Sequence, residues 1–222
     1  MTTRDWLSWL CVSSTVALAA CGGGSSDGDG GPAPTTRAEG AYVGSITGAT
    51  SGALQLLVLE NDAYFGFYGF SSSSGFLVAG FVQGQGASNN GAFTSADFKD
   101  FGTAPPTTGT VAATYVANTS IDGTVATPAG LLSFTGRPIA DSIYVYNTPA
   151  TISTIAGSWS LAALGGVGVA LTIAGDGSLS GASGGCTFTG TLVPRTSGKN
   201  VFDLALTFGP APCASPNGSG TG

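Results

Sequence analysis

The chain of 222 residues contains no histidine, and only 8% of its residues are charged. Without histidine, a Ser-His-Asp or Cys-His catalytic site and a His-ligated zinc or copper centre are excluded. The 6 basic residues are outnumbered by 12 acidic ones, so no basic patch is available to neutralise phosphates. We therefore predict a protein that is not an enzyme, that holds no cofactor or metal, and that does not bind nucleic acid.

What the sequence does contain is typical of an all-β protein. Glycine, of which there are 37, serine and threonine dominate, and Val, Phe, Tyr and Ile supply the apolar content. From Gly40 onward, short stretches alternate apolar and polar residues, most clearly at Phe202–Phe208, and turn residues separate them. We expect an antiparallel meander that forms either one closed β-barrel with extra strands or two packed β-modules.

Two halves of this region share an order of features, which is consistent with an internal duplication. A Gly-rich start at Gly40 is followed by an apolar strand and a turn at Asn61–Asp62, and a similar start at Gly157 is followed by a turn at Asp176–Gly177. We place a first β-module at residues 40–146 and a second at 147–222. The second is expected to end in a disordered C-terminal tail.

The amino-terminal segment has the three parts of a secretory signal: a polar start, an apolar stretch, and small residues at its end. The apolar stretch, residues 6–20, is shorter than the roughly 20 residues that a spanning helix needs. It ends in Leu18-Ala19-Ala20-Cys21, which resembles the lipobox of bacterial lipoproteins at all four positions. In that family the signal, here residues 1–20, is removed, the cysteine becomes a diacylglyceryl cysteine, and the new amino terminus is acylated, for example with palmitate.

The resemblance implies that Cys21 is lipidated and that the protein is anchored in the bacterial cell envelope. Gly22 stands where an aspartate would signal retention in the inner membrane in many bacteria, so the resemblance favours the outer membrane. Several acyl chains together give stable membrane attachment. Residues 21–39 then form the lipidated cysteine and a flexible linker, which spans roughly 20 to 25 Å. Simple secretion, with Cys21 as a free thiol, is the alternative.

The four cysteines can be divided by their places in the chain. Cys11 lies within the signal and Cys21 takes the lipid. Cys186 and Cys213 remain as a pair in an oxidising compartment, so we predict a disulfide between them.

One strand is a candidate binding surface, because aromatic residues occupy both of its faces: Tyr64, Phe65, Phe67, Tyr68 and Phe70. If the core covers the aromatic side chains on one face only, those on the other face would form a site for a protein or a small apolar ligand. The alternative is a central strand covered on both faces. Asp97 and Asp100 are the best candidates for an enzyme that uses carboxylates alone, although charges beside Phe98 are more typical of a strand end.

Short pieces such as Gly91-Ala92-Phe93 are similar to the barrel lobes of surface lipoproteins of the transferrin-binding-protein type. This resemblance implies antiparallel Gly-x-Phe strands and no functional residue. The sequence therefore predicts a lipid-anchored outer-membrane β-protein with a binding or structural role. An integral outer-membrane β-barrel, which needs strands of about 9 to 11 residues, is the main alternative.

Overall fold

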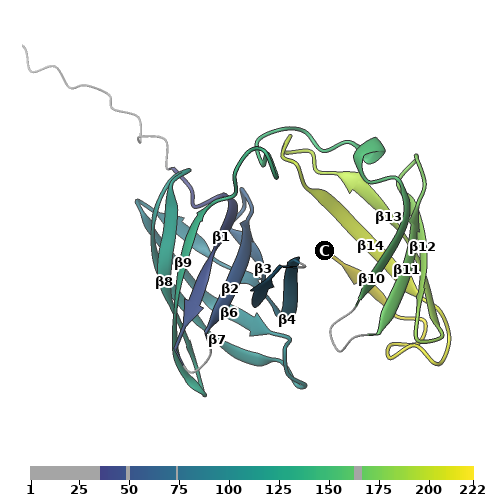
Figure 1. Cartoon of the computed structure of the whole chain (residues 1–222), viewed down its shortest axis with the longest axis horizontal. Helices are drawn as coiled ribbons and strands as arrows, with labels where there is room; N and C mark the ends of the chain where they lie inside the picture. The colour runs from purple at the N-terminus through teal and green to yellow at the C-terminus, as the bar shows by residue number, and fades with distance from the viewer. Residues whose placement is uncertain (1–35, 49–50, 74, 163–166) are drawn as a thin grey trace, which may run out of the picture. The chain divides into compact units, whose positions relative to one another are not determined.

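The computed structural model describes residues 36–48, 51–73, 75–162 and 167–222, which form fifteen strands and one short 3-10 helix (Figure 1). The strands make two antiparallel sheets, so the prediction of an all-β antiparallel meander is confirmed. The predicted signal, Cys21 and the linker up to residue 35 lie outside the described residues. Within the described ranges, no helix has the length and apolar character needed to cross a membrane.

The first sheet is a closed eight-stranded β-barrel. Strands β1 to β4 and β6 to β9 each pair with the next one along the chain, β9 returns to β1, and β4 pairs with β6 through Val82 and Asp100. The short strand β5 extends the sheet beside β6. The strands are β1 (Gly40–Thr47), β2 (Gly52–Val58), β3 (Ala63–Ser72), β4 (Gly75–Gln85), β5 (Ala87–Asn89), β6 (Ala92–Asp100), β7 (Thr107–Val116), β8 (Ser120–Thr127) and β9 (Gly130–Pro138).

The second sheet has six strands in sequence order, β10 to β15, and its two edges are not joined to each other. A 3-10 helix, η1 (Ile152–Thr154), precedes it. The strands are β10 (Gly157–Ala162), β11 (Gly168–Ile173), β12 (Ser178–Ser183), β13 (Cys186–Pro194), β14 (Phe202–Phe208) and β15 (Ser219–Thr221). The alternation that the sequence shows at Phe202–Phe208 is that of β14, whose four large apolar side chains are the more buried set.

The C-terminal residues are tied to the second sheet in two ways. Cys186 and Cys213 form a disulfide, as predicted, with a Cα–Cα distance of 4.5 Å. Ser219–Thr221 then pair with β14 as the edge strand β15. The prediction of a disordered tail is therefore wrong for these residues, because the bridge brings the end of the chain back to an unpaired sheet edge.

Two hairpin turns of the proposed duplication have the same geometry. In the β2–β3 turn the Leu59 N–H donates to the Ala63 carbonyl at 2.8 Å, and Asp62 has a φ of 65°. In the β11–β12 turn the Ala174 N–H donates to the Ser178 carbonyl at 2.8 Å, and Gly177 has a φ of 86°. Both turns need a residue in the left-handed region at the same position, which glycine and aspartate tolerate. The duplication itself stays a prediction, as do the module boundaries.

The barrel core follows from the period of two along each strand. In β7 the side chains of Val111, Ala113 and Tyr115 are buried, while Ala112 and Thr114 between them are exposed. Successive side chains of a strand point to opposite faces, so the apolar set lines the inside of the barrel. The largest fully buried side chains, Tyr42, Ile121 and Val58, are all inward residues of barrel strands.

One end of the barrel is closed by residues 36–39, which we call the plug segment. Ala38 is fully buried, and its carbonyl accepts a hydrogen bond of 2.9 Å from the Tyr42 hydroxyl. The Thr36 carbonyl accepts one of 2.5 Å from Tyr115, and the Ala38 N–H donates to Ser88 Oγ at 3.0 Å. The sequence predicts a flexible linker up to residue 39. That prediction is wrong for residues 36–39, because they fill the barrel end.

Asp62 holds the plug segment in place. This buried carboxylate accepts a hydrogen bond of 2.6 Å from Arg37 Nη1 and another of 2.6 Å from Ser88 Oγ. The Ser88 N–H adds a third bond of 3.1 Å. The β2–β3 turn, β5 and the plug segment are therefore connected through one side chain.

Candidate binding cavity of the barrel

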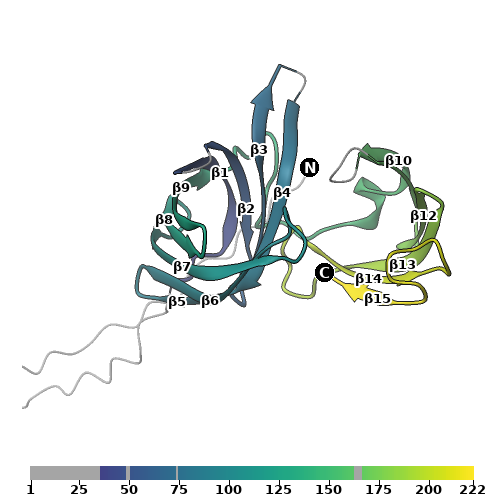
Figure 2. The same ribbon diagram turned by 90° about the horizontal axis from the view of Figure 1, so that it is seen from below.

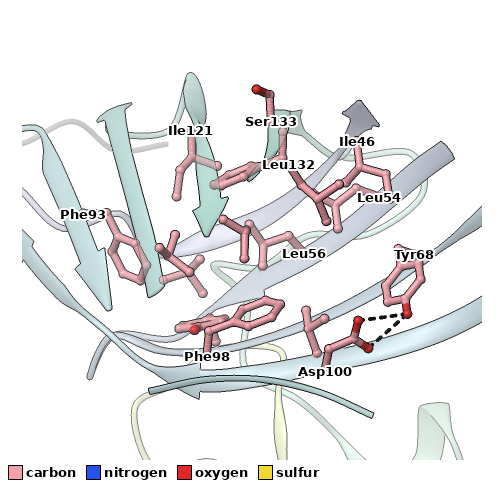
Figure 3. A pocket seen from close by; sticks show the side chains of 16 residues that line it. Ile46, Leu54, Leu56, Tyr68, Phe93, Phe98, Asp100, Ile121, Leu132 and Ser133 are labelled. Carbon is pink, nitrogen blue, oxygen red and sulfur yellow. Dashed lines mark hydrogen bonds between the residues drawn. The ribbon is translucent and has the colours of Figure 1, made fainter. Parts of the chain in front are cut away.

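The barrel contains a cavity of about 130 Å³, whose lining runs from Val58, which pairs with Gly40 beside the plug segment, to Ile46 near the other end of β1. Strand β1 begins at the plug segment, so its far residue Ile46 marks the opposite end, where it pairs with Phe134 of β9. We call this opposite end the mouth. The cavity is lined by 16 residues, most of them apolar (Figure 3). They are Ile46, Leu54, Leu56, Val58, Tyr64, Tyr68, Val82, Phe93, Phe98, Asp100, Val111, Ile121, Val125, Leu132, Ser133 and Phe134.

Asp100 is the only charged residue in this lining, and it forms a pair with Tyr68 (Figure 3). The Tyr68 hydroxyl donates to the two carboxylate oxygens of Asp100 at 3.0 and 3.1 Å. The Gly102 N–H also donates to Oδ1, at 2.8 Å. Burial, together with the neighbouring carboxylate, raises the pKa of Tyr68 to about 12. The phenol therefore stays protonated at neutral pH and continues to donate to Asp100.

The second tyrosine of the lining is satisfied within the barrel. The Tyr64 hydroxyl donates to Ser95 Oγ at 3.1 Å, and Ser95 Oγ donates to the Gln85 carbonyl at 2.7 Å. Burial raises the pKa of Tyr64 to about 12, so this group also stays neutral. Away from Tyr68 and Asp100, the lining is therefore mostly apolar.

Two glycines make room for these tyrosine rings. Gly80 and Gly84 of β4 are the cross-strand partners of Tyr68 and Tyr64. A Cβ atom on Gly80 would lie 2.1 Å from the Tyr68 ring, and one on Gly84 would lie 2.3 Å from the Tyr64 hydroxyl. Each ring therefore lies across the neighbouring strand, where any other residue would clash. The sequence carries this signal as an equal spacing of the two tyrosines and the two glycines, which sequence reasoning missed.

The structure separates the predicted aromatic residues of β3 into two sets. Tyr64 and Tyr68 line the cavity, whereas Phe65 and Phe67 point outward. Phe67 is 45% exposed and lies 5.3 Å from the ring centre of Phe81 on β4. Phe65 lies 6.4 Å from the same ring, so an aromatic cluster covers part of the outer wall.

Phe70 belongs to neither set. It is 53% exposed and lies in the part of the β3–β4 hairpin that extends beyond the barrel wall (Figure 2). The hairpin continues past the barrel because β3 and β4 pair with each other to their common turn. The cavity residues that sequence reasoning missed are mostly aliphatic, and a single strand does not reveal them because they come from different strands.

The two carboxylates considered for catalysis, Asp97 and Asp100, lie in different surroundings. Asp97 forms an ion pair with Lys99, and the lysine lowers the pKa of the Asp97 carboxyl. Asp100 lines the cavity and is paired with Tyr68. Across the described ranges, no group of three or more Cys, Asp or Glu side chains is placed to hold a metal ion.

Comparison with known proteins yields no relative. No protein-family model matches this chain, and neither the curated proteins nor the solved structures give a significant match.

Proposed function

We propose that this protein is a lipid-anchored, non-enzymatic binding protein of the bacterial outer membrane, and that its barrel takes up a small apolar ligand. The observation that carries the binding role is the apolar cavity inside a closed barrel. Eight-stranded barrels have an interior that is either filled by side chains or able to hold one small ligand. In this barrel the plug segment closes one end, and a cavity remains among the inward side chains.

The size of the cavity is suited to a small molecule. A cavity of about 150 Å³ lined by aliphatic and aromatic side chains stays dry and can bind benzene. The cavity here, about 130 Å³, has a similar volume and a similar lining. An apolar ligand would restore the dispersion contacts that the lining residues lack. This makes binding of a ring or short chain favourable without any further charge or metal.

The outer wall of the barrel favours an anchored protein over an integral one. Outward residues of β7 such as Thr110 and Thr114 are exposed, and Arg137 of β9 pairs with Asp122 of β8 at 2.5 Å on the outside. An integral outer-membrane barrel carries an apolar band on this surface and polar groups inside. In this barrel the interior is largely apolar, and the outer wall at β7 to β9 carries these polar and charged side chains, which supports a wall that faces water on that side.

The anchor is tested by labelling with a fatty acid in a bacterial host. The lipobox resemblance places the lipid on Cys21, so wild-type protein is expected to take up palmitate label and the Cys21→Ala variant to take up none. Cys11→Ala is the matched control, because Cys11 lies in the predicted signal and is removed with it. Equal labelling of the Cys21→Ala variant would refute the anchor.

The binding role is tested by titrating toluene into the unanchored Cys21→Ala form of the chain and measuring heat by calorimetry. Saturable binding is expected. An added Leu132→Trp substitution fills the cavity and should abolish it, whereas Leu131→Trp should not, because Leu131 is 61% exposed and absent from the lining. If toluene does not bind, or if both tryptophan variants behave alike, the proposed binding role is wrong.

A further inference from the structure

We infer that the ligand of the barrel is a small cationic amine, with its apolar part in the cavity and its ammonium group against Asp100. The inference rests on the proposed binding role and adds the chemical class of the ligand. It follows from three features of the cavity: its single charge, the arrangement of donors around that charge, and its volume.

The charge of the lining has one sign. Asp100 is the only ionisable acid or base among the lining residues apart from the two tyrosines, which remain neutral. In the described part of the chain, no Lys or Arg forms an ion pair with Asp100, because the neighbouring Lys99 is paired with Asp97. The negative charge of Asp100 would therefore repel a ligand carboxylate or phosphate and attract an ammonium group.

The hydrogen bonds around Asp100 leave room for a ligand donor. Oδ1 accepts from both Tyr68 and Gly102, whereas the described partners of Oδ2 are limited to the Tyr68 hydroxyl at 3.1 Å. A carboxylate oxygen can accept about two hydrogen bonds, so Oδ2 retains capacity for one more. An ammonium group carries three donors and no acceptor. It can therefore donate to Oδ2 and, with a second hydrogen, to the lone pairs of the Tyr68 oxygen.

The geometry around Tyr68 fixes this polar end relative to the apolar space. The ring is held against Gly80, where a Cβ would lie 2.1 Å away, and its hydroxyl is directed to Asp100. In the close-up, Tyr68 and Asp100 lie together at one side of the lining while Leu54 and Leu56 lie beside the cavity from another strand (Figure 3). A ligand that reaches Asp100 with its head must then place its remaining atoms among aliphatic side chains.

Volume limits that remainder to about the size of a benzene ring, by comparison with apolar cavities of similar volume. Benzylamine is therefore a suitable probe, and three molecules of nearly the same shape differ from it in the head group alone: toluene without a polar head, benzyl alcohol with a neutral donor, and benzoate with a negative charge. All four are titrated calorimetrically into the unanchored Cys21→Ala form at low ionic strength.

Benzylamine is expected to bind about tenfold more tightly than toluene, as a hydrogen bond to a charged group contributes roughly 1.5 kcal/mol or more. Benzoate is expected to bind more weakly than toluene. An added Asp100→Asn substitution should remove the preference for the amine, so that this variant binds benzylamine no more tightly than it binds toluene. Asp97→Asn is the matched control, because this acid lies on the same strand but is absent from the cavity lining, and it should preserve the preference.

The outcomes separate the inference from the proposal beneath it. If toluene binds but benzylamine binds no better, or if Asp100→Asn leaves the preference intact, the amine inference is overturned and the binding role stands. If benzoate is the tightest of the four, the ligand is an anion and the inference is overturned as well. If none of the four binds, the binding role itself fails.

Discussion

Removal of the disulfide should destabilise the second sheet by a predictable amount. The bridge joins Cys186 at the start of β13 to Cys213, 27 residues later. In the chain-entropy model, a closed loop of this length lowers the entropy of the unfolded chain enough to stabilise the fold by about 3.5 kcal/mol at 25 °C. We expect the double Cys186→Ser, Cys213→Ser variant to lose roughly this free energy of unfolding, which is a large share of the stability of an ordinary domain.

Urea unfolding measures this loss, with fluorescence of Trp159 on β10 as the probe. The other two tryptophans, Trp6 and Trp9, lie in the predicted signal and would be absent from the processed protein. Reduction of the wild-type protein should lower the urea midpoint as much as the double substitution does. Barrel unfolding, followed by tyrosine absorbance, should shift little. A double variant whose stability lies within about 1 kcal/mol of the oxidised wild type would refute the reasoning.

Three further predictions concern the barrel. Asp62→Asn should lower the free energy of unfolding by about 2 to 3 kcal/mol, because it weakens charged hydrogen bonds to a buried carboxylate. The control Asp122→Asn changes an exposed ion pair and should lower this free energy by under about 1 kcal/mol. Thermal unfolding of the two variants measures the difference. Gly80→Ala should displace the tyrosine ring opposite it, costing about 1 to 3 kcal/mol and weakening benzylamine binding more than toluene binding in the same calorimetric assay. Burial raises the pKa of Tyr42 and of Tyr64 to about 12, so with rising pH these tyrosines lose their protons in the unfolded chain before they do so in the folded protein. The free energy of unfolding should therefore keep its full value below about pH 10 and fall between pH 10 and pH 12. Loss of stability at lower pH, or normal titration of these tyrosines in an alkaline absorbance scan, would contradict this.

The sequence predicted the elements better than their closure. Alternation at Phe202–Phe208 and the Asp176–Gly177 turn depend on neighbouring residues alone, so period and turn chemistry were enough to identify them. Closure of the barrel depends on β9 returning to β1 and on the contact of β4 with β6, and these are pairings between distant segments. The choice between one barrel and two modules was therefore open until the structure was available.

The sequence predicted a candidate binding surface on β3, and it did not predict the cavity. Aromatic residues on both faces of β3 drew attention to Tyr64 and Tyr68, which do line the cavity, and equally to Phe65 and Phe67, which do not. Period two cannot tell which face is inside when both are aromatic. The place of Asp100 in the cavity lining was also hidden, since beside Asp97 and Lys99 it resembled an ordinary charged strand end.

The abundance of glycine indicated only an all-β protein. Two of these glycines, Gly80 and Gly84, lie within β4 and are needed because tyrosine rings from β3 occupy the space above them. Such a pairing joins residues more than ten positions apart, and only the register between the two strands reveals it.

The plug segment determines at which end of the barrel an amino-terminal attachment lies. The chain enters the barrel through residues 36–39 at the closed end, and the mouth lies at the far end of the strands. Whatever is joined to the amino-terminal side of Thr36, whether a lipid, a purification tag or a surface linkage, is attached at the end opposite the mouth, where we propose that the ligand enters. Immobilisation through this side should therefore leave ligand exchange rates unaltered, and the length of the tether can vary without any change in the binding site.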